Sequence, residues 1–92
     1  MFDLTSFRRD LLCVIAGMEG AKGVAIKTEL ESAYEKQIHY VQIYQNLDAL
    51  VEMGLVTKGS LDGRTNSYSL TDRGSREIKD RQEWKQTYLD KR

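Results

Sequence analysis

The sequence predicts a mainly α-helical fold with one small β-hairpin, and three observations support this prediction. Apolar residues recur at helical spacing between residues 37 and 56. An Asp-Gly turn separates two β-prone runs around residue 63. A polar segment with a few apolar residues closes the chain. The 92 residues, 40% of them hydrophobic, predict one small domain with a thin core, which association with a second copy would thicken.

The charges of the chain balance, because 14 basic residues offset 14 acidic ones. Many nucleic-acid-binding proteins are strongly basic, so this balance argues against DNA binding. It does not exclude DNA binding, since charge can be segregated on the surface. Cys13 is the only cysteine, which excludes an internal disulfide and a zinc site built from cysteines within one chain. We therefore expect a reducing, cytoplasmic setting.

Residues 8–18 weakly resemble a signal peptide, because two arginines precede an apolar run. Asp10 interrupts this pattern and the run ends at Glu19, so we expect a helix instead. No other segment approaches the length of a membrane span, and no membrane association is expected.

The first helix is expected to start at Thr5 or Ser6 as N-cap and to run to about Gly17. Its apolar side is broad enough to face both the core and a partner; it consists of Phe7, Leu11, Cys13, Val14 and Ile15. We expect Cys13 to pack in the interior. The glycine-containing residues 18–23 indicate a loop.

A second helix is expected from Val24 to Lys36. Its predicted inward residues are Ala25, Ile26, Leu30, Ala33 and Tyr34. A tight connection through the sole histidine, His39, leads to the next helix. One histidine makes an isolated metal ligand, so we interpret His39 as an entry or N-cap residue that contacts phosphate when protonated.

The third helix, residues 39–53, combines an apolar stripe with an uncharged outer face. The stripe, predicted to be buried, consists of Tyr40, Ile43, Tyr44, Leu47, Leu50 and Val51. The outer face carries Val41, Gln42, Gln45 and Asn46, and no charged residue occurs from 37 to 47. Amides can pair with base edges, and the absence of carboxylates avoids repulsion by phosphate. The alternative is an ordinary solvated helix face. Gly54 is expected as the C-cap glycine.

Two β-prone runs, residues 55–59 and 66–70, predict a hairpin. Its loop would expose Arg64, Thr65 and Asn66, with Lys58 at its base. Arg64 alternatively only solvates the turn.

The last helix is expected to be capped by Thr71 and to run to about Leu89. Trp84 and Tyr88 lie four residues apart on one face, whereas Ile78 and Leu89 fall on an adjacent face. The rest of the helix is polar, so we expect it to extend outward and pack against a second copy. The alternative is that Trp84 and Tyr88 fold back onto the first helix of the same chain.

The order helix, helix, helix, hairpin, helix is that of a winged helix-turn-helix, here with a C-terminal dimerisation helix. Particular residues strengthen this assignment. Three segments resemble conserved patterns of the PadR family of transcriptional regulators: Gly23-Val24-Ala25-Ile26 with Leu30, the Ile43-Tyr44-x-x-Leu47-x-x-Leu50 run into Gly54-Leu55-Val56, and Tyr68-x-Leu70-Thr71-x-x-Gly74. The resemblance is to short archaeal members with a single C-terminal helix. Two departures are Val24, where the family usually has Tyr, and a wing with one Arg where many relatives have several basic residues.

The resemblance implies a homodimeric, cytoplasmic and nucleoid-associated regulator, usually a repressor, that binds a palindromic operator in double-stranded DNA. Residues 1–70 would form the DNA-binding domain, with recognition helix 39–53 and wing 57–70, and residues 71–92 the dimerisation helix. The expected base contacts are Val41, Gln42, Gln45 and Asn46. The expected backbone contacts are Lys27, Lys36, His39, Tyr44, Lys58, Arg64, Thr65 and Asn66. The expected dimer contacts are Phe7, Leu11, Ile78, Trp84, Tyr88 and Leu89.

The sequence bears on two other classes of function. A winged-helix adaptor that binds protein rather than DNA would suit the zero net charge, and its binding would change little with salt. An enzyme is not expected, because the chain lacks a glycine-rich phosphate loop and a catalytic set of residues. The sequence gives no pattern for a metal site, a cofactor or a small-molecule effector.

Overall fold

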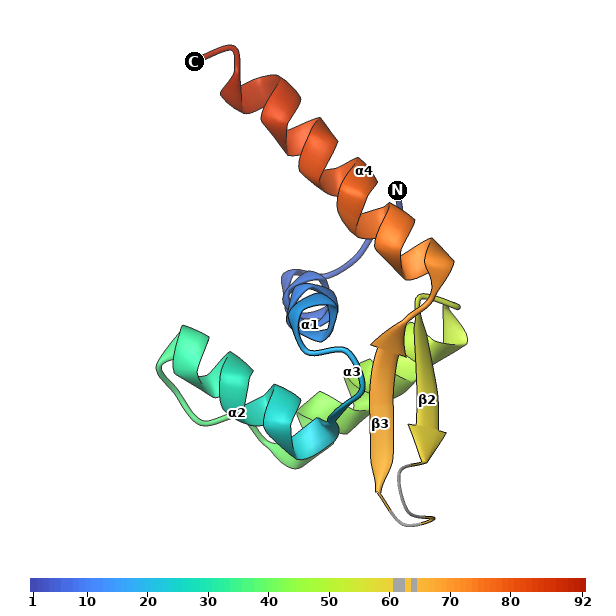
Figure 1. Cartoon of the computed structure of the whole chain (residues 1–92). Coiled ribbons are helices and arrows are strands. Elements are labelled where there is room, and N and C mark those ends of the chain that lie inside the picture. Colours follow the sequence, from blue (N-terminus) through green and yellow to red (C-terminus); the bar gives the residue numbers. More distant parts are fainter. Residues whose placement is uncertain (61–62, 64) are drawn as a thin grey trace.

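The computed structural model describes residues 1–60, 63 and 65–92 and confirms the winged helix-turn-helix (Figure 1). The elements are α1 (Ser6–Gly17), β1 (Ala21–Lys22), α2 (Gly23–Tyr34), α3 (Tyr40–Glu52), β2 (Val56–Ser60), β3 (Asn66–Leu70) and α4 (Asp72–Leu89). In Figure 1, α1 lies at the centre, α2 and α3 lie below it, the hairpin stands to one side, and α4 projects away. Asp62 of the predicted turn and Arg64 of the predicted wing contact lie outside the described residues.

The core lies where α1, α2, α3 and the hairpin meet. The most enclosed aliphatic side chains on the helices are Leu11, Ile15, Ile26, Ile43, Leu47 and Leu50, all at 0% exposure. On the helices these positions follow the spacing of three and four residues that places side chains on one face. From the hairpin, Tyr68 also reaches 0% exposure, as the alternation in the sequence predicts for one face of a strand. The core therefore fixes α3 against the hairpin.

The sheet has three strands, in the order β1-β3-β2, where the sequence predicted a two-stranded hairpin and a loop at residues 18–23. Ala21 and Lys22 pair with Tyr68 and Ser67 of β3 in antiparallel register. Gly20, at φ 78°, turns the chain so that its N–H donates to the Tyr68 carbonyl at 2.9 Å. A strand of two residues is too short for an alternating pattern, which is why the sequence did not predict it.

Helix α2 ends two residues earlier than predicted. Glu35 adopts a left-handed conformation, φ 57°, and its N–H donates to the Glu31 carbonyl, which closes the helix before Lys36. Ala33 is exposed, so its predicted inward position is wrong. Ala33 lies about 100° around the helix from Tyr34, whose ring and hydroxyl contact Phe7 and Asp10 of α1. Tyr34 remains half-buried because its hydroxyl donates to Asp10 of α1. Burial, reinforced by Asp10, raises the pKa of Tyr34 to about 12.

Helix α1 starts as predicted, with the Thr5 hydroxyl accepting the Arg8 N–H at 3.2 Å. The prediction for Cys13 is wrong, because its side chain is exposed. Leu12, which the sequence analysis left out of the apolar side, is buried instead, at 2% exposure. Leu11 and Leu12 occupy the covered side of α1, and Cys13, about 100° further round the helix than Leu12, points to solvent.

Helix α4 is anchored at its start and free at its end. The Thr71 hydroxyl accepts the Gly74 N–H at 3.0 Å, the predicted cap. Gly74 lies so close to the Leu55 carbonyl that a β-carbon there would be 2.1 Å from its oxygen, so glycine is required. The buried Glu77 accepts the Phe2 N–H at 2.8 Å and pairs with Arg81. These contacts hold the N-terminal segment against the first half of α4.

The second half of α4 leaves the body of the domain, and residues 82–92 are all exposed. The molecule is consequently elongated, with extents of 48 × 30 × 19 Å (Figure 1). None of the helices in the described ranges is long and apolar enough to cross a membrane.

Candidate nucleic-acid interface

The outward face of α3 is uncharged over its first half, as predicted. Val41 is 64% exposed, and Gln42 and Gln45 are exposed beside it. The opposite face holds the buried Ile43 and Leu47, so the helix cannot rotate without exposing the core. The fold therefore presents two amide side chains and a branched aliphatic one in a fixed orientation.

Tyr40 does not belong to the buried stripe, contrary to the sequence prediction. It is 54% exposed and stacks on Tyr44, with ring centroids 6.3 Å apart and planes 9° apart. Tyr40 is the first residue of α3, and Ile38 in the preceding turn fills the core at that level, at 4% exposure. The Lys27 ammonium lies 4.5 Å from the centre of the Tyr40 ring, a cation–π contact that covers one face of the ring.

Asn46 is engaged within the chain, although the sequence predicted a base contact. Its Oδ1 accepts from the Arg8 Nε at 2.9 Å, and its Nδ2 donates to the Gln42 carbonyl at 2.7 Å. The side chain is half-buried between α3 and α1. Helical periodicity did not indicate this contact, because a long side chain from α1 supplies the partner.

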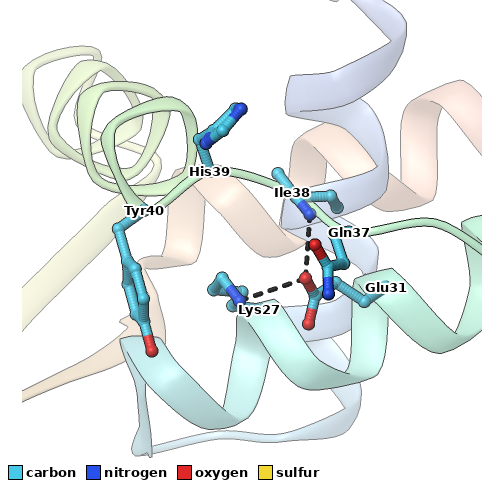
Figure 2. Close-up of a pocket in the computed structure, with 6 residues that line it drawn as sticks. All are labelled: Lys27, Glu31, Gln37, Ile38, His39 and Tyr40. Carbon is cyan, nitrogen blue, oxygen red and sulfur yellow. Dashed lines mark hydrogen bonds and ion pairs between the residues drawn. The ribbon is translucent and has the colours of Figure 1, made fainter.

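The connection between α2 and α3 encloses a hollow of about 580 Å³, lined by Lys27, Glu31, Gln37, Ile38, His39 and Tyr40 (Figure 2). Glu31 Oε2 accepts the Ile38 N–H at 2.8 Å and the Lys27 ammonium at 3.0 Å. Glu31, which is not among the predicted inward residues of α2, braces the turn that leads into α3.

Lys27 is not available as a free phosphate contact, which corrects its predicted role. Its side chain is 16% exposed, paired with Glu31 and held against Tyr40. The pairing is possible because Lys27 and Glu31 lie four residues apart on one face of α2.

Glu31 should make the fold sensitive to acid. The Ile38 N–H, and then Lys27, hold the pKa of Glu31 below its ordinary value. A carboxyl with a lowered pKa stabilises the fold above its unfolded-state pKa, and this contribution disappears as the pH falls through the folded-state pKa. Urea unfolding between about pH 5 and pH 3 should therefore show a smaller loss of stability in Glu31→Gln than in the wild type. Equal slopes in the two proteins would remove Glu31 from this role.

The wing joins the first turn of α2 in a second hollow of about 320 Å³, lined by Lys22, Gly23, Val24, Tyr44, Thr65 and Asn66. The Tyr44 ring packs on Gly23, where a β-carbon would lie 2.6 Å from the ring. This contact leaves Tyr44 half-buried at the edge of the interface. Lys22 is exposed at this hollow, and the sequence analysis missed it because strand β1, which places it there, was not predicted.

Lys58 lies on β2 as predicted, but its ammonium is 3.5 Å from the Asp48 carboxylate of α3. Both side chains remain accessible, at 39% and 61% exposure. Asp48 was not among the predicted contacts, because the uncharged range of the sequence ends at Leu47. The pair leaves Lys58 partly neutralised and places a carboxylate beside the wing.

The remaining predicted backbone contacts lie at the start of α3 and the end of α2. His39 is the exposed N-cap of α3, and its side chain makes no capping hydrogen bond. The Lys36 ammonium lies 5.8 Å from the centre of the Tyr34 ring and is exposed.

The predicted dimer residues separate into two groups. Trp84, Tyr88 and Leu89 are 49%, 54% and 52% exposed, which argues against their folding back onto α1. Leu11 is fully buried in the core of its own chain, so its predicted place on a dimer surface is wrong. The broad apolar side of α1 could face either the core or a partner. Because α1 lies at the centre of the domain, Leu11 faces the core. Phe7 and Ile78 are half-buried and also pack against the core of their own chain.

Comparison with known proteins identifies relatives over most of the chain. The family described as the transcriptional regulator PadR-like family matches residues 11–80. No sequence among curated proteins matches significantly.

Two solved structures of RosR from H. salinarum are 44% identical to this chain and cover 94% of it. The form grown from NaBr has a TM-score of 0.87, with 77% of its own chain covered. The structure described as the complex hsRosR-S1 has a TM-score of 0.89, with 76% covered. FabT from Streptococcus pneumoniae, in complex with DNA, shares the fold, with a TM-score of 0.77 and 14% identity over 97% of this chain and 59% of FabT.

Proposed function

Because the chain belongs to the PadR-like family of transcriptional regulators, we propose that it binds double-stranded DNA in a sequence-specific manner and represses transcription from a palindromic operator as a homodimer. The family consists of transcriptional regulators and not of enzymes. FabT, which shares the fold, was solved in complex with DNA, and this supports the same class of ligand.

The observation that carries the proposal is the uncharged outer face of α3. A major groove about 12 Å wide admits one α-helix, and its base edges offer donors and acceptors to amide side chains. Gln42 and Gln45 are exposed on this face, and either amide can bond adenine through two hydrogen bonds. Val41, at 64% exposure, offers an apolar contact to a thymine methyl group.

Backbone contacts in the proposal come from both sides of the hollow beside the wing. Lys22 contributes a cation there, while Thr65 and Asn66 contribute polar side chains from the wing. Tyr44 points its hydroxyl toward the first turn of α2, where a phosphate can also accept from backbone N–H groups. His39 and Lys36 would contact the backbone near the start of α3. Lys58 would exchange its partner Asp48 for a phosphate.

The dimer in the proposal forms through the second half of α4. Trp84 and Tyr88 pack edge to face, with ring centroids 5.2 Å apart, and Leu89 is exposed next to them. Large exposed aromatic side chains of this kind commonly form the centre of protein interfaces. Two-fold pairing of α4 would present two copies of α3 to half-sites about one helical turn apart.

One set of observations favours a second candidate, a winged-helix adaptor that binds protein. Two lysines that were predicted to contact the DNA backbone are paired with carboxylates, Lys27 with Glu31 and Lys58 with Asp48. The net charge of the chain is zero. A surface whose lysines are paired in this way would attract negatively charged DNA only weakly. A neutral surface of a partner protein would not repel this surface.

Salt dependence separates the two candidates. Fluorescence anisotropy would follow binding of the purified protein to labelled genomic fragments at increasing salt. For DNA binding, the logarithm of the association constant should fall linearly with the logarithm of the salt concentration, by about 0.9 per phosphate contacted. Gln45→Glu places a carboxylate on the outer face of α3 and tests whether this face contacts DNA. This variant should bind DNA more weakly than the wild type at every salt concentration. No binding by the wild type even at low salt would favour the adaptor.

A further inference from the structure

We propose that Arg8 of α1 is a DNA-backbone contact and that Asn46 is its positioning residue. This inference deepens the proposed function and rests on it. Asn46 would then act through Arg8, where the sequence predicted that it contacts a base.

The side chains of Arg8 and Asn46 form a chain of hydrogen bonds between α1 and α3. The Arg8 Nε donates to Asn46 Oδ1 at 2.9 Å, and Asn46 Nδ2 donates to the Gln42 carbonyl at 2.7 Å. Both ends of the amide are thus used within the protein. A guanidinium has five N–H donors, and this contact uses one of them, the Nε–H. The two terminal nitrogens keep the planar, forked geometry that matches a phosphate.

Among the residues that the structure describes, no carboxylate pairs with Arg8. Over residues 1–60, 63 and 65–92, the ion pairs of the structure are Lys27 with Glu31, Lys58 with Asp48, and Arg81 with Glu77. Arg8 has a neutral amide as its partner instead. Unlike Lys27 and Lys58, it therefore needs no carboxylate to be displaced before a phosphate binds.

Arg8 lies beside α3 on the flank that faces away from the wing. With α3 in a DNA groove, this flank would face the phosphate backbone that the wing does not reach. Successive residues of a helix point about 100° apart, so positions 42 and 46 lie on one flank of α3 and positions 44 and 48 on the opposite flank, with 41 and 45 between them. A helix in the major groove has a phosphate backbone along each flank. The flank of Tyr44 and Asp48 faces the wing, where Lys58 lies. The flank of Gln42 and Asn46 carries no charge of its own, and Arg8 supplies a cation there.

The test compares Arg8→Gln with the wild type by salt titration on genomic fragments and on random DNA. A phosphate contact predicts a salt slope lower by about one in Arg8→Gln, with the same fold-loss on both DNAs. Arg76→Gln is the matched control, because it removes the same charge from an exposed position on α4 and should keep the wild-type slope. Asn46→Ala should weaken binding on both DNAs and add no further loss to Arg8→Gln, as expected when two residues act as one unit.

Each outcome decides the proposal. A wild-type slope in Arg8→Gln, with the wild type binding normally, overturns the role of Arg8 and leaves the proposed function intact. Absence of binding by the wild type overturns both. A loss in Asn46→Ala that is confined to genomic fragments shows that Asn46 reads bases, which also overturns the proposal. Should Arg8→Gln fail to fold, Arg8→Met decides, because it keeps the aliphatic stem and removes the charge: a salt slope lower by about one supports the phosphate contact, and a wild-type slope in the folded variant overturns it.

Discussion

Replacement of both Trp84 and Tyr88 by alanine should convert the proposed dimer into a monomer and weaken operator binding by about 10²–10⁴-fold. The two rings are 49% and 54% exposed, and all residues from 82 to 92 are exposed in the single chain. Loss of the dimer removes the advantage of binding two half-sites together, which is why the expected effect on DNA is larger than any single contact would give.

Sedimentation velocity would measure the association state, and anisotropy the affinity. Lys79→Ala with Gln86→Ala is the matched control, because both residues are exposed on the opposite face of α4 and the number of substitutions is the same. The control should remain a dimer. A dimer that persists in the Trp84 and Tyr88 variant at micromolar concentration would place the interface on another surface.

Gln42→Ala combined with Gln45→Ala should abolish preference for the operator while leaving binding to random DNA nearly unchanged. Each amide that bonds a base through two hydrogen bonds contributes roughly 1–3 kcal/mol of discrimination, so the pair should lower operator affinity by about 30-fold to about 20,000-fold. Both side chains are exposed, and their removal leaves the buried stripe of α3 intact.

The matched control for this variant is Gln37→Ala, which removes an exposed amide from the turn before α3. Competition assays with operator and random DNA would give the specificity ratio for each protein. If the double variant lost affinity equally for both DNAs, Gln42 and Gln45 would serve as general contacts and another surface would read the sequence.

The sequence predicted the elements well where a single segment holds the necessary pattern. The caps at Thr5 and Thr71 follow from their own side chains, and Gly54 takes φ +77° at the end of α3 as predicted. The stripe of Ile43, Leu47 and Leu50 followed from spacing alone, and this stripe determines which face of α3 points outward.

Contacts between distant elements could not be predicted in this way. The bond from Arg8 to Asn46 spans 38 residues, and nothing in either segment indicates it. Strand β1 exists because β3 offers a free edge to a two-residue segment. Leu11 and Cys13 both lie in an apolar run, yet one is buried and the other exposed, because the arrangement of the neighbouring elements selects the covered side.

The sequence did not predict that two lysines of the site pair with carboxylates. Lys27 and Lys58 were both predicted to contact phosphate, but Lys27 forms an ion pair with Glu31 and Lys58 forms one with Asp48. Only the folded structure brings Asp48 to Lys58, since they come from α3 and β2. At these two positions the predicted interface is neutralised by carboxylates of the same chain.

The most direct test of sequence-specific binding as a dimer is the selection of bound sequences from a random DNA library by the purified protein. We expect an enriched inverted repeat whose half-sites lie about one helical turn apart, because groove contact by α3 and two-fold pairing by α4 are both required to produce it. Enrichment of a single half-site would contradict the dimer. Absence of any recurring sequence would contradict specific DNA binding and favour the protein-binding adaptor.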